Sequence, residues 1–202
     1  MTLYAALFLS LVYLTLSNAA CVSAAPFSIS DRKMVSIEYL TPTENDRDIR
    51  TTNIDVYYYL NDVEHINLSI SWGLAVTYAS GNITQLEGSI AGGNLREVRY
   101  ENSAVGIGPG LLASFQLWSN EKFSFHLNGS GNFIVYNRRF PAGGDYYNFM
   151  WRGGPSFKYN IDNSKAVDIG YHWAHVSNGQ GVGPKNPSYE AKGVILRFVG
   201  FF

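Results

Sequence analysis

Alternation of apolar and polar side chains is the feature of this sequence that most limits its fold. Between Ile66 and Thr77 every second residue is a large apolar one, and the residues between them are small or polar. Successive side chains of a β-strand point to opposite faces of a sheet, so this period predicts a strand with one apolar and one polar face. A helix with one buried face would repeat its apolar residues about every three to four positions instead.

The same alternation recurs along the chain and predicts eight strands, at 33–41, 51–60, 65–77, 104–118, 123–136, 146–160, 165–177 and 189–202. The connections alternate between short turns and longer loops. The turns are 61–64, 119–122 and 162–164, and the loops are 42–50, 78–103, 137–145 and 178–188. Short turns at one end and long loops at the other are typical of outer-membrane barrels. We therefore predict an all-β fold, an eight-stranded antiparallel transmembrane β-barrel.

Composition and the end of the chain support a membrane location. Charged residues make up 15% of the sequence, below the roughly 25% of soluble domains. The net charge of −1, without a clustered basic face, argues against nucleic acid as a partner. The terminal Phe202 follows alternating apolar residues, as in the assembly signal of bacterial outer-membrane barrels. A soluble barrel that turns its apolar face into a ligand cavity is the alternative.

The first 24 residues form a separate segment. Leu3 to Leu16 are almost all apolar, and small residues follow. This pattern is typical of a signal peptide, because the apolar run is shorter than the ~20 residues of a membrane-spanning helix. We place the cleavage near residue 24 and assign 25–202 to a single barrel domain, so that Cys21 leaves with the signal. A retained membrane anchor is the alternative.

Strand parity predicts which side chains leave the barrel at the loop 178–188. With both chain ends on the periplasmic side, this loop is extracellular. The apolar residues are odd-numbered in 165–177 and even-numbered in 189–202, so these two sets face lipid. Antiparallel pairing that matches the two sets allows three opposed pairs: Ile169 with Leu196, Tyr171 with Val194, and His175 with Glu190.

At the loop 178–188, the lipid-facing residues of the two strands are of the types that acyl transfer requires. Opposed strand residues have Cβ atoms about 4.5–5.5 Å apart, and His175 and Ser177 share one face of their strand. We expect Ser177 as nucleophile, His175 as general base and then acid, and Glu190 as the group that orients the imidazole. Asn178 and Gly179 follow directly, and the Asn178 amide or a backbone N–H could donate to an oxyanion. The alternative is a set of solvated polar residues at a barrel rim.

The segment Tyr171 to Gly179, with its His-x-Ser-Asn pattern, the later Glu190 and the terminal Phe202 resemble the PagL family, the outer-membrane lipid A 3-O-deacylases. The resemblance is most specific over about 165–202. It implies an eight-stranded barrel that hydrolyses the ester-linked acyl chain at the 3-position of lipid A, without a metal or cofactor. It also implies the roles of nucleophile for Ser177, base for His175, triad acid for Glu190 and oxyanion donor for Asn178.

The predicted partners follow from this reading: lipid A or lipopolysaccharide in the outer leaflet and the bacterial outer membrane itself, with a homodimer left open. The predicted loops carry five cations that either contact lipid A phosphates or are simply solvated: Arg96, Arg99, Arg138, Arg139 and Lys185. Two other functions stay open. The chain could be a non-enzymatic structural or adhesion barrel, or an outer-membrane phospholipase.

For the remaining histidines we expect a structural role and not a catalytic or metal-binding one. His65, His126 and His172 are scattered over different strands, and we expect no metal site. The inward set should instead form a hydrogen-bonded barrel interior, made of His126, His172, Asp55, Asp168, Arg152 and Arg197.

Overall fold

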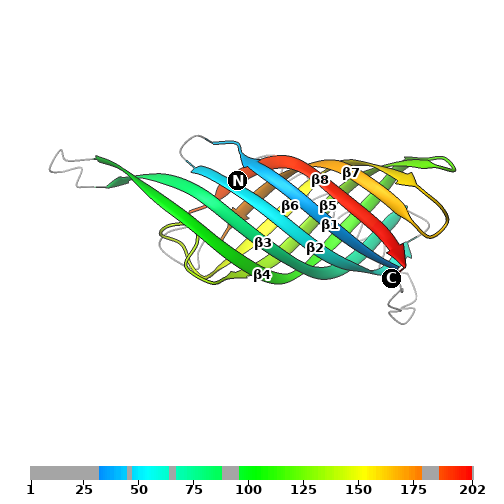
Figure 1. Ribbon diagram of the computed structural model, residues 1–202, viewed down its shortest axis with the longest axis horizontal. Helices are drawn as coiled ribbons and strands as arrows, with labels where there is room; N and C mark the ends of the chain where they lie inside the picture. Colours follow the sequence, from blue (N-terminus) through cyan, green and yellow to red (C-terminus); the bar gives the residue numbers. More distant parts are fainter. Residues whose placement is uncertain (1–31, 45–46, 64–66, 88–95, 179–186, 202) are drawn as a thin grey trace.

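The computed structural model describes residues 32–44, 47–63, 67–87, 96–178 and 187–201. The strands are β1 (Arg32–Pro42), β2 (Arg47–Val63), β3 (Leu68–Glu87), β4 (Arg96–Ser119), β5 (Phe123–Tyr136), β6 (Tyr147–Asn160), β7 (Ala166–Ser177) and β8 (Tyr189–Phe201). Each strand pairs antiparallel with the next, and β8 pairs with β1, which closes the barrel (Figure 1). The predicted signal peptide, Gly179 and Lys185 lie outside the described residues.

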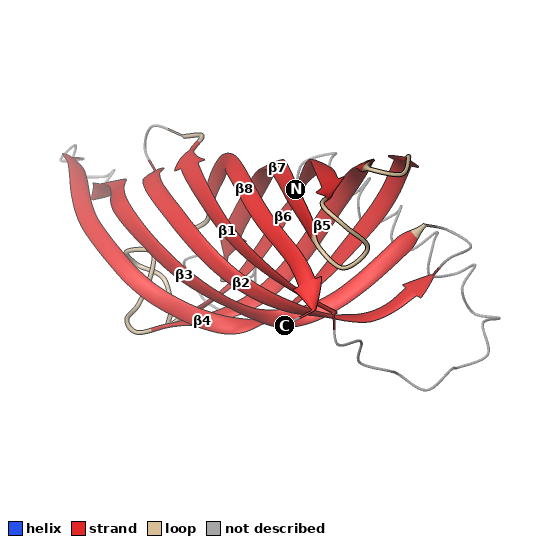
Figure 2. Cartoon of the chain, turned by 45° about the vertical axis from the view of Figure 1, so that its right-hand side comes forward, coloured by secondary structure: helices blue, strands red, loops and turns tan. Residues whose placement is uncertain are grey.

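The two ends of the barrel differ. We call the end that carries the connections after β1, β3, β5 and β7 the loop end, and the end with the other connections and the two barrel termini the turn end. The described residues contain no helix that could cross a membrane, and Figure 2 shows only strands and loops among them.

Apolar side chains cover the outside of the barrel. Along β7 the even-numbered side chains are mostly buried, and the odd-numbered ones are exposed or half-buried. Exposed apolar residues are present on all eight strands, among them Ile37, Ile54, Leu74, Ile107, Phe125, Trp151, Ile169 and Val194. A closed barrel satisfies every strand edge, and an apolar outside suits a bilayer. The predicted transmembrane barrel is thus confirmed, and the soluble alternative, with its apolar face turned inward, is wrong.

The middle of the barrel interior is held by a buried charge network around Arg152. The guanidinium donates to Glu38 at 2.7 Å and to both carboxylate oxygens of Asp55 at 2.9 and 3.0 Å. It also donates to the hydroxyl of Tyr57 and to the side-chain oxygen of Asn132. Buried charges are stable only when they are paired and hydrogen-bonded, and this cluster meets both conditions.

The network continues through His172 to a second ion pair. Arg197 contacts His172 Nε2 at 2.8 Å and pairs with Asp168 at 2.8 Å, while His172 Nδ1 contacts Glu38 at 2.7 Å. A guanidinium can only donate, so Nε2 accepts and Nδ1 carries the proton that is donated to Glu38. The predicted inward set is confirmed, with His126 nearby bonded to Ser114 and Ser124.

An apolar cluster fills the interior at the loop end. Phe140, from the connection between β5 and β6, is fully buried between Tyr136 and Tyr189, with ring centroids 5.1 and 6.0 Å away. Asn148 donates to the Phe140 carbonyl at 2.7 Å and holds this connection in place. The connection therefore folds inward and packs against the barrel wall.

Three predicted segment boundaries are wrong. The predicted loop 42–50 is too long, because β2 begins at Arg47. The predicted loop 78–103 is largely strand, because β3 and β4 stay paired from Tyr78 and Val105 out to Glu87 and Arg96. This hairpin reaches beyond the other strands at the left of Figure 1. Arg96 and Arg99 therefore belong to β4 and not to a loop. The predicted turn at 61–64 begins too early, because β2 continues to Val63 after a register shift between Tyr59 and Asn61.

Candidate active site

The outward-facing ends of β7 and β8 carry the predicted site. Their ladder pairs Ile169 with Leu196, Tyr171 with Val194 and His175 with Glu190, as the parity argument predicts. The pairing runs from Ala166 to Val176 without a register shift. His175 and Glu190 consequently stand side by side on the outer wall, near the loop end.

His175 lies between a carboxylate and an aromatic ring. Its Nδ1 is 3.6 Å from Glu190 Oε1, with side-chain exposures of 28% and 53%. This distance permits electrostatic attraction but is longer than a hydrogen bond. On the other side, on β6, Trp151 pairs with His175 and stacks on its ring, with centroids 5.9 Å apart and planes at 24°.

Ser177 shares the outward face with His175 but is not bonded to it. It is half-buried at the end of β7, opposite Phe149 of β6. The hydrogen bonds of the described residues do not join Ser177 to His175. Residues two apart on a strand are about 6.6–6.8 Å apart along it, so the two side chains must lean toward each other before a proton can pass.

Asn178 lies on the other side of the wall. It is buried, and its amide nitrogen donates to Asp145 in the connection between β5 and β6, at 3.2 Å. Its side chain thus ties the end of β7 to the loop-end interior, away from the face of Ser177. An oxyanion donor at this position would be a backbone N–H. Gly179, the other predicted donor, lies outside the described residues.

Trp151 is a neighbour that the sequence reasoning missed. The sequence did contain the signal, since the tight turn at 162–164 fixes the register between the strands on either side of it. Counting outward from that turn sets Trp151 opposite His175 and Phe149 opposite Ser177, as observed. Both aromatic residues are exposed on the outer wall.

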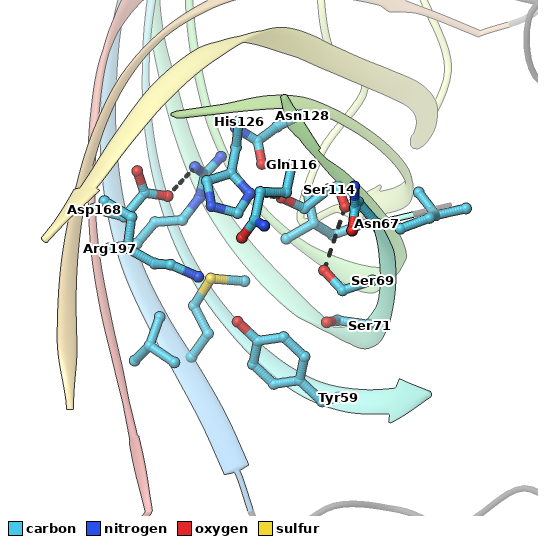
Figure 3. Close-up of a pocket in the computed structure, with 15 residues that line it drawn as sticks. Tyr59, Asn67, Ser69, Ser71, Ser114, Gln116, His126, Asn128, Asp168 and Arg197 are labelled. Carbon is cyan, nitrogen blue, oxygen red and sulfur yellow. Dashed lines mark hydrogen bonds and ion pairs between the residues drawn. The ribbon is translucent and has the colours of Figure 1, made fainter. Parts of the chain in front are cut away.

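A second concentration of polar groups lies inside the barrel at the turn end. It is a pocket of about 240 Å³ into which His126, Asp168 and Arg197 point (Figure 3). Ser69, Ser71 and Ser114 line its other side. The pocket is remote from Ser177, and its charges belong to the interior network. Within the described ranges, no group of three or more His, Cys, Asp or Glu side chains is placed to hold a metal ion.

Fold and surface together define the class: an eight-stranded transmembrane β-barrel whose location fits an outer membrane. Among solved structures it is similar to the outer membrane enzyme PagL, with 13% identity, a TM-score of 0.51, and coverage of 81% of this chain and 97% of PagL. Neisserial surface protein A matches with 12% identity, 87% and 99% coverage and a TM-score of 0.43. Ail of Yersinia pestis matches with 18% identity, 83% and 99% coverage and a TM-score of 0.31.

At this identity the likeness to PagL concerns the fold alone. No protein-family model matches the sequence. No curated protein matches it either.

Proposed function

We propose that the protein is a bacterial outer-membrane serine esterase that removes the 3-O-linked acyl chain of lipid A. The observation that carries this proposal is the pairing of His175 with Glu190 on the outer wall, with Ser177 on the same face at the end of β7. The resemblance of the segment around His175 to the PagL family and the fold shared with PagL support it. Export by the predicted signal peptide belongs to the same proposal.

The reaction would be an acyl transfer in two steps. His175 turns Nδ1 toward Glu190, which leaves Nε2 to accept the proton of Ser177. The serine oxygen bonds to the ester carbonyl carbon, the ester C–O bond breaks, and His175 returns the proton to the sugar oxygen that leaves. Water, deprotonated by His175, then hydrolyses the acyl-serine and releases a fatty acid. Glu190 would stabilise the imidazolium formed in both steps.

The loose geometry of these side chains is compatible with this role. Catalytic hydrogen bonds are often long in free enzymes and tighten when the substrate binds. Trp151 stacks on one side of the imidazole and limits its movement there, so most of the movement that brings the two groups together would come from Ser177. A substrate ester lodged between Ser177 and Phe149 would exclude water from this contact and strengthen it.

The position of the site matches a lipid substrate that stays in the membrane. Beside Ser177 the outer wall presents the exposed side chain of Phe149, and below it those of Trp173, Tyr171 and Val194. An acyl chain could lie along these residues while its ester reaches Ser177, so the lipid would approach sideways and need not enter the barrel. The same aromatic residues would also serve as an ordinary lipid-facing belt.

The test is to incubate the refolded protein with purified lipopolysaccharide and to determine the mass of the lipid A by mass spectrometry. We expect the wild type to remove one 3-hydroxyacyl chain and Ser177→Ala to remove none. Ser119→Ala is the matched control, because Ser119 is exposed at the turn end, and it should retain full activity.

Other outcomes would point elsewhere. Unchanged lipid A with cleavage of phospholipids would indicate a phospholipase that uses the same chemistry. Unchanged lipids of both kinds, with a folded wild type, would indicate a barrel without enzymatic activity. Activity that survives in Ser177→Ala would contradict Ser177 as nucleophile.

A further inference from the structure

A polar hollow lies on the outer face of β2, β3 and β4 near the loop end. It has a volume of about 650 Å³. These strands lie side by side in Figure 1, as the strand order requires. The side chains that define the hollow come from three strands and the start of the connection after β5: Asp48, Arg50, Tyr78, Ser80, Asn82, Glu101, Ser103 and Arg138.

The strand register arranges these residues in rows across the wall. One row runs from Arg50 through Ser80 to Ser103. Arg138, in the connection after β5, also lines the hollow, next to Asn137, which bonds to the backbone of Val105 on β4. The hollow thus has an arginine on β2 and another just after β5, with two hydroxyl groups on the strands between them.

The row beneath it marks the upper edge of the apolar surface. It runs from Thr52 through Tyr78 to Val105, and Tyr78 and Val105 are exposed apolar side chains. Residues one row apart on the same face are about 6.6–6.8 Å apart along a strand. The arginine row is therefore one step outward from the lipid-facing surface, at the height of lipid headgroups.

The side chains of the two arginines of the hollow have no protein partner among the described residues, whereas those of other arginines nearby do. Arg47 contacts Glu44 and Ser188, and Arg96 pairs with Glu87. Among the described residues, no ion pair or side-chain hydrogen bond involves Arg50 or Arg138. Two exposed guanidinium groups line one hollow, and neither is paired within the described residues, so both can bind an anion from outside the chain.

We propose that this hollow binds the phosphate-bearing headgroup of an outer-leaflet lipid. Guanidinium groups bind phosphate through paired N–H donors, and Ser80 and Ser103 add hydroxyl donors between them. The acyl chains would run down the wall over Tyr78 and Val105. This apolar contact distinguishes a lipid from free phosphate as the occupant.

Acidic groups set the outer limit of the site. The next row outward runs from Asp48 through Asn82 to Glu101, and its carboxylates repel a phosphate placed any higher. The phosphate is thereby restricted to the arginine row. Removing one of these charges, as in Glu101→Gln, should strengthen binding.

This site is independent of the proposed esterase site. The esterase residues lie on β6, β7 and β8, and the hollow lies on β2, β3 and β4, so the two occupy different parts of the closed wall. A lipid bound here would be held beside the barrel and not cleaved, whether or not the protein is an enzyme.

The test measures binding of lipid A with two phosphates by native mass spectrometry, on the full chain carrying Ser177→Ala so that no lipid is hydrolysed. In that background, Arg50→Gln together with Arg138→Gln should weaken the affinity for one lipid equivalent at least tenfold. Lipid A stripped of its phosphates should bind no better than this. Arg96→Gln, an exposed charge on the same hairpin, is the control and should leave binding unchanged.

Two further measurements separate lipid binding from misfolding and from the binding of free phosphate. Glu101→Gln should raise the affinity, which a misfolded variant could not do, and inorganic phosphate at millimolar concentration should leave the lipid bound. Equal affinity for lipid A with and without phosphates, or unchanged affinity in the double arginine variant, would overturn the proposal. Displacement of the lipid by inorganic phosphate alone would overturn it as well, since the site would then select free anions.

Discussion

The interior and the outer wall of β7 use the same kinds of residue in opposite ways. Inside, His172 contacts Glu38 and Arg197 at 2.7 and 2.8 Å and is almost completely buried. Outside, three residues further along the strand, His175 is 28% exposed and its nearest carboxylate oxygen is 3.6 Å away. Both ring nitrogens of His172 are engaged by protein partners, whereas only Nδ1 of His175 faces a carboxylate and its Nε2 can take part in proton transfer.

The difference between the two histidines shows how burial distinguishes structural polar groups from reactive ones. In the barrel interior an unpaired charge is costly, so its partners must be built into the fold. At the wall near the loop end, water and lipid headgroups can solvate a charge, so a loosely paired histidine is tolerated. We therefore assign stability to the network around Arg152 and reactivity to the group around His175.

The largest effect should come from Arg152→Leu. This change leaves Glu38 and Asp55 as buried charges without their main partner, and breaking a buried ion pair in this way costs about 3–5 kcal/mol. Denaturant unfolding of the refolded barrel in detergent measures the loss. Arg96→Leu removes an exposed ion pair with Glu87 and should change the unfolding free energy little. Similar values for the two variants would refute the structural role of the network.

The two histidines should separate stability from activity. His172→Phe removes two buried hydrogen bonds and should lower stability by about 1–3 kcal/mol, with lipid A deacylation largely retained in the folded fraction. His175→Phe should lower the rate of deacylation by roughly 10²–10⁴-fold and leave stability nearly unchanged. Unfolding curves and initial rates of deacylation are measured for both variants. An equal loss of activity in the two would contradict the assignment of catalysis to His175 and of stability to His172.

A smaller effect is expected at Glu190. Its carboxylate is half-exposed and beyond hydrogen-bond distance from His175, so its contribution is mainly to orient the imidazole and stabilise its charge. Glu190→Gln should slow deacylation about tenfold, or about 1.4 kcal/mol, through kcat and not KM. A loss as large as that of Ser177→Ala would mean that the contact closes to a full hydrogen bond during the reaction.

The smallest effect concerns the turn between β6 and β7, outside the membrane-spanning strands. Hydrogen bonds from Ser164 hold the pKa of Asp162 below its ordinary value of 3.8. A lowered pKa means that the turn is stabilised above pH 3.8 and that this gain disappears as the pH falls through the lower folded-state value. Asp162→Ala should therefore be slightly less stable than the wild type at pH 7 and equal to it at strongly acidic pH. A difference that persists in acid would contradict the carboxylate as its cause.

The sequence predicted the geometry of β7 and β8 well for a physical reason. Lipid on one side and a polar interior on the other force strict alternation, and one slip would turn every side chain to the wrong face. No register shift interrupts the pairing of β7 with β8. The opposition of His175 and Glu190 could therefore be counted from Ile169 and Leu196.

The ends of β3 and β4 could not be predicted in the same way. Apolar alternation stops where the bilayer stops, but backbone pairing continues from Ser80 and Ser103 out to Glu87 and Arg96. There a hydrogen bond between Tyr100 and Glu87 links the two strands. Polar hairpins of this kind carry no lipid-facing signal in the sequence. The even number of Asn178 already implied an inward position, but its bond to Asp145 was hidden, because that contact depends on how the β5–β6 connection folds.

The most direct test of the account is the reactivity of Ser177 itself. The refolded protein would be treated with a fluorophosphonate, which forms a covalent adduct with activated serines, and the adduct would be located by peptide mass spectrometry. We predict one adduct, on Ser177, which disappears in His175→Phe and persists in His172→Phe. No adduct on Ser177, or an adduct that does not depend on His175, would contradict the assignment of the chemistry to the outer wall.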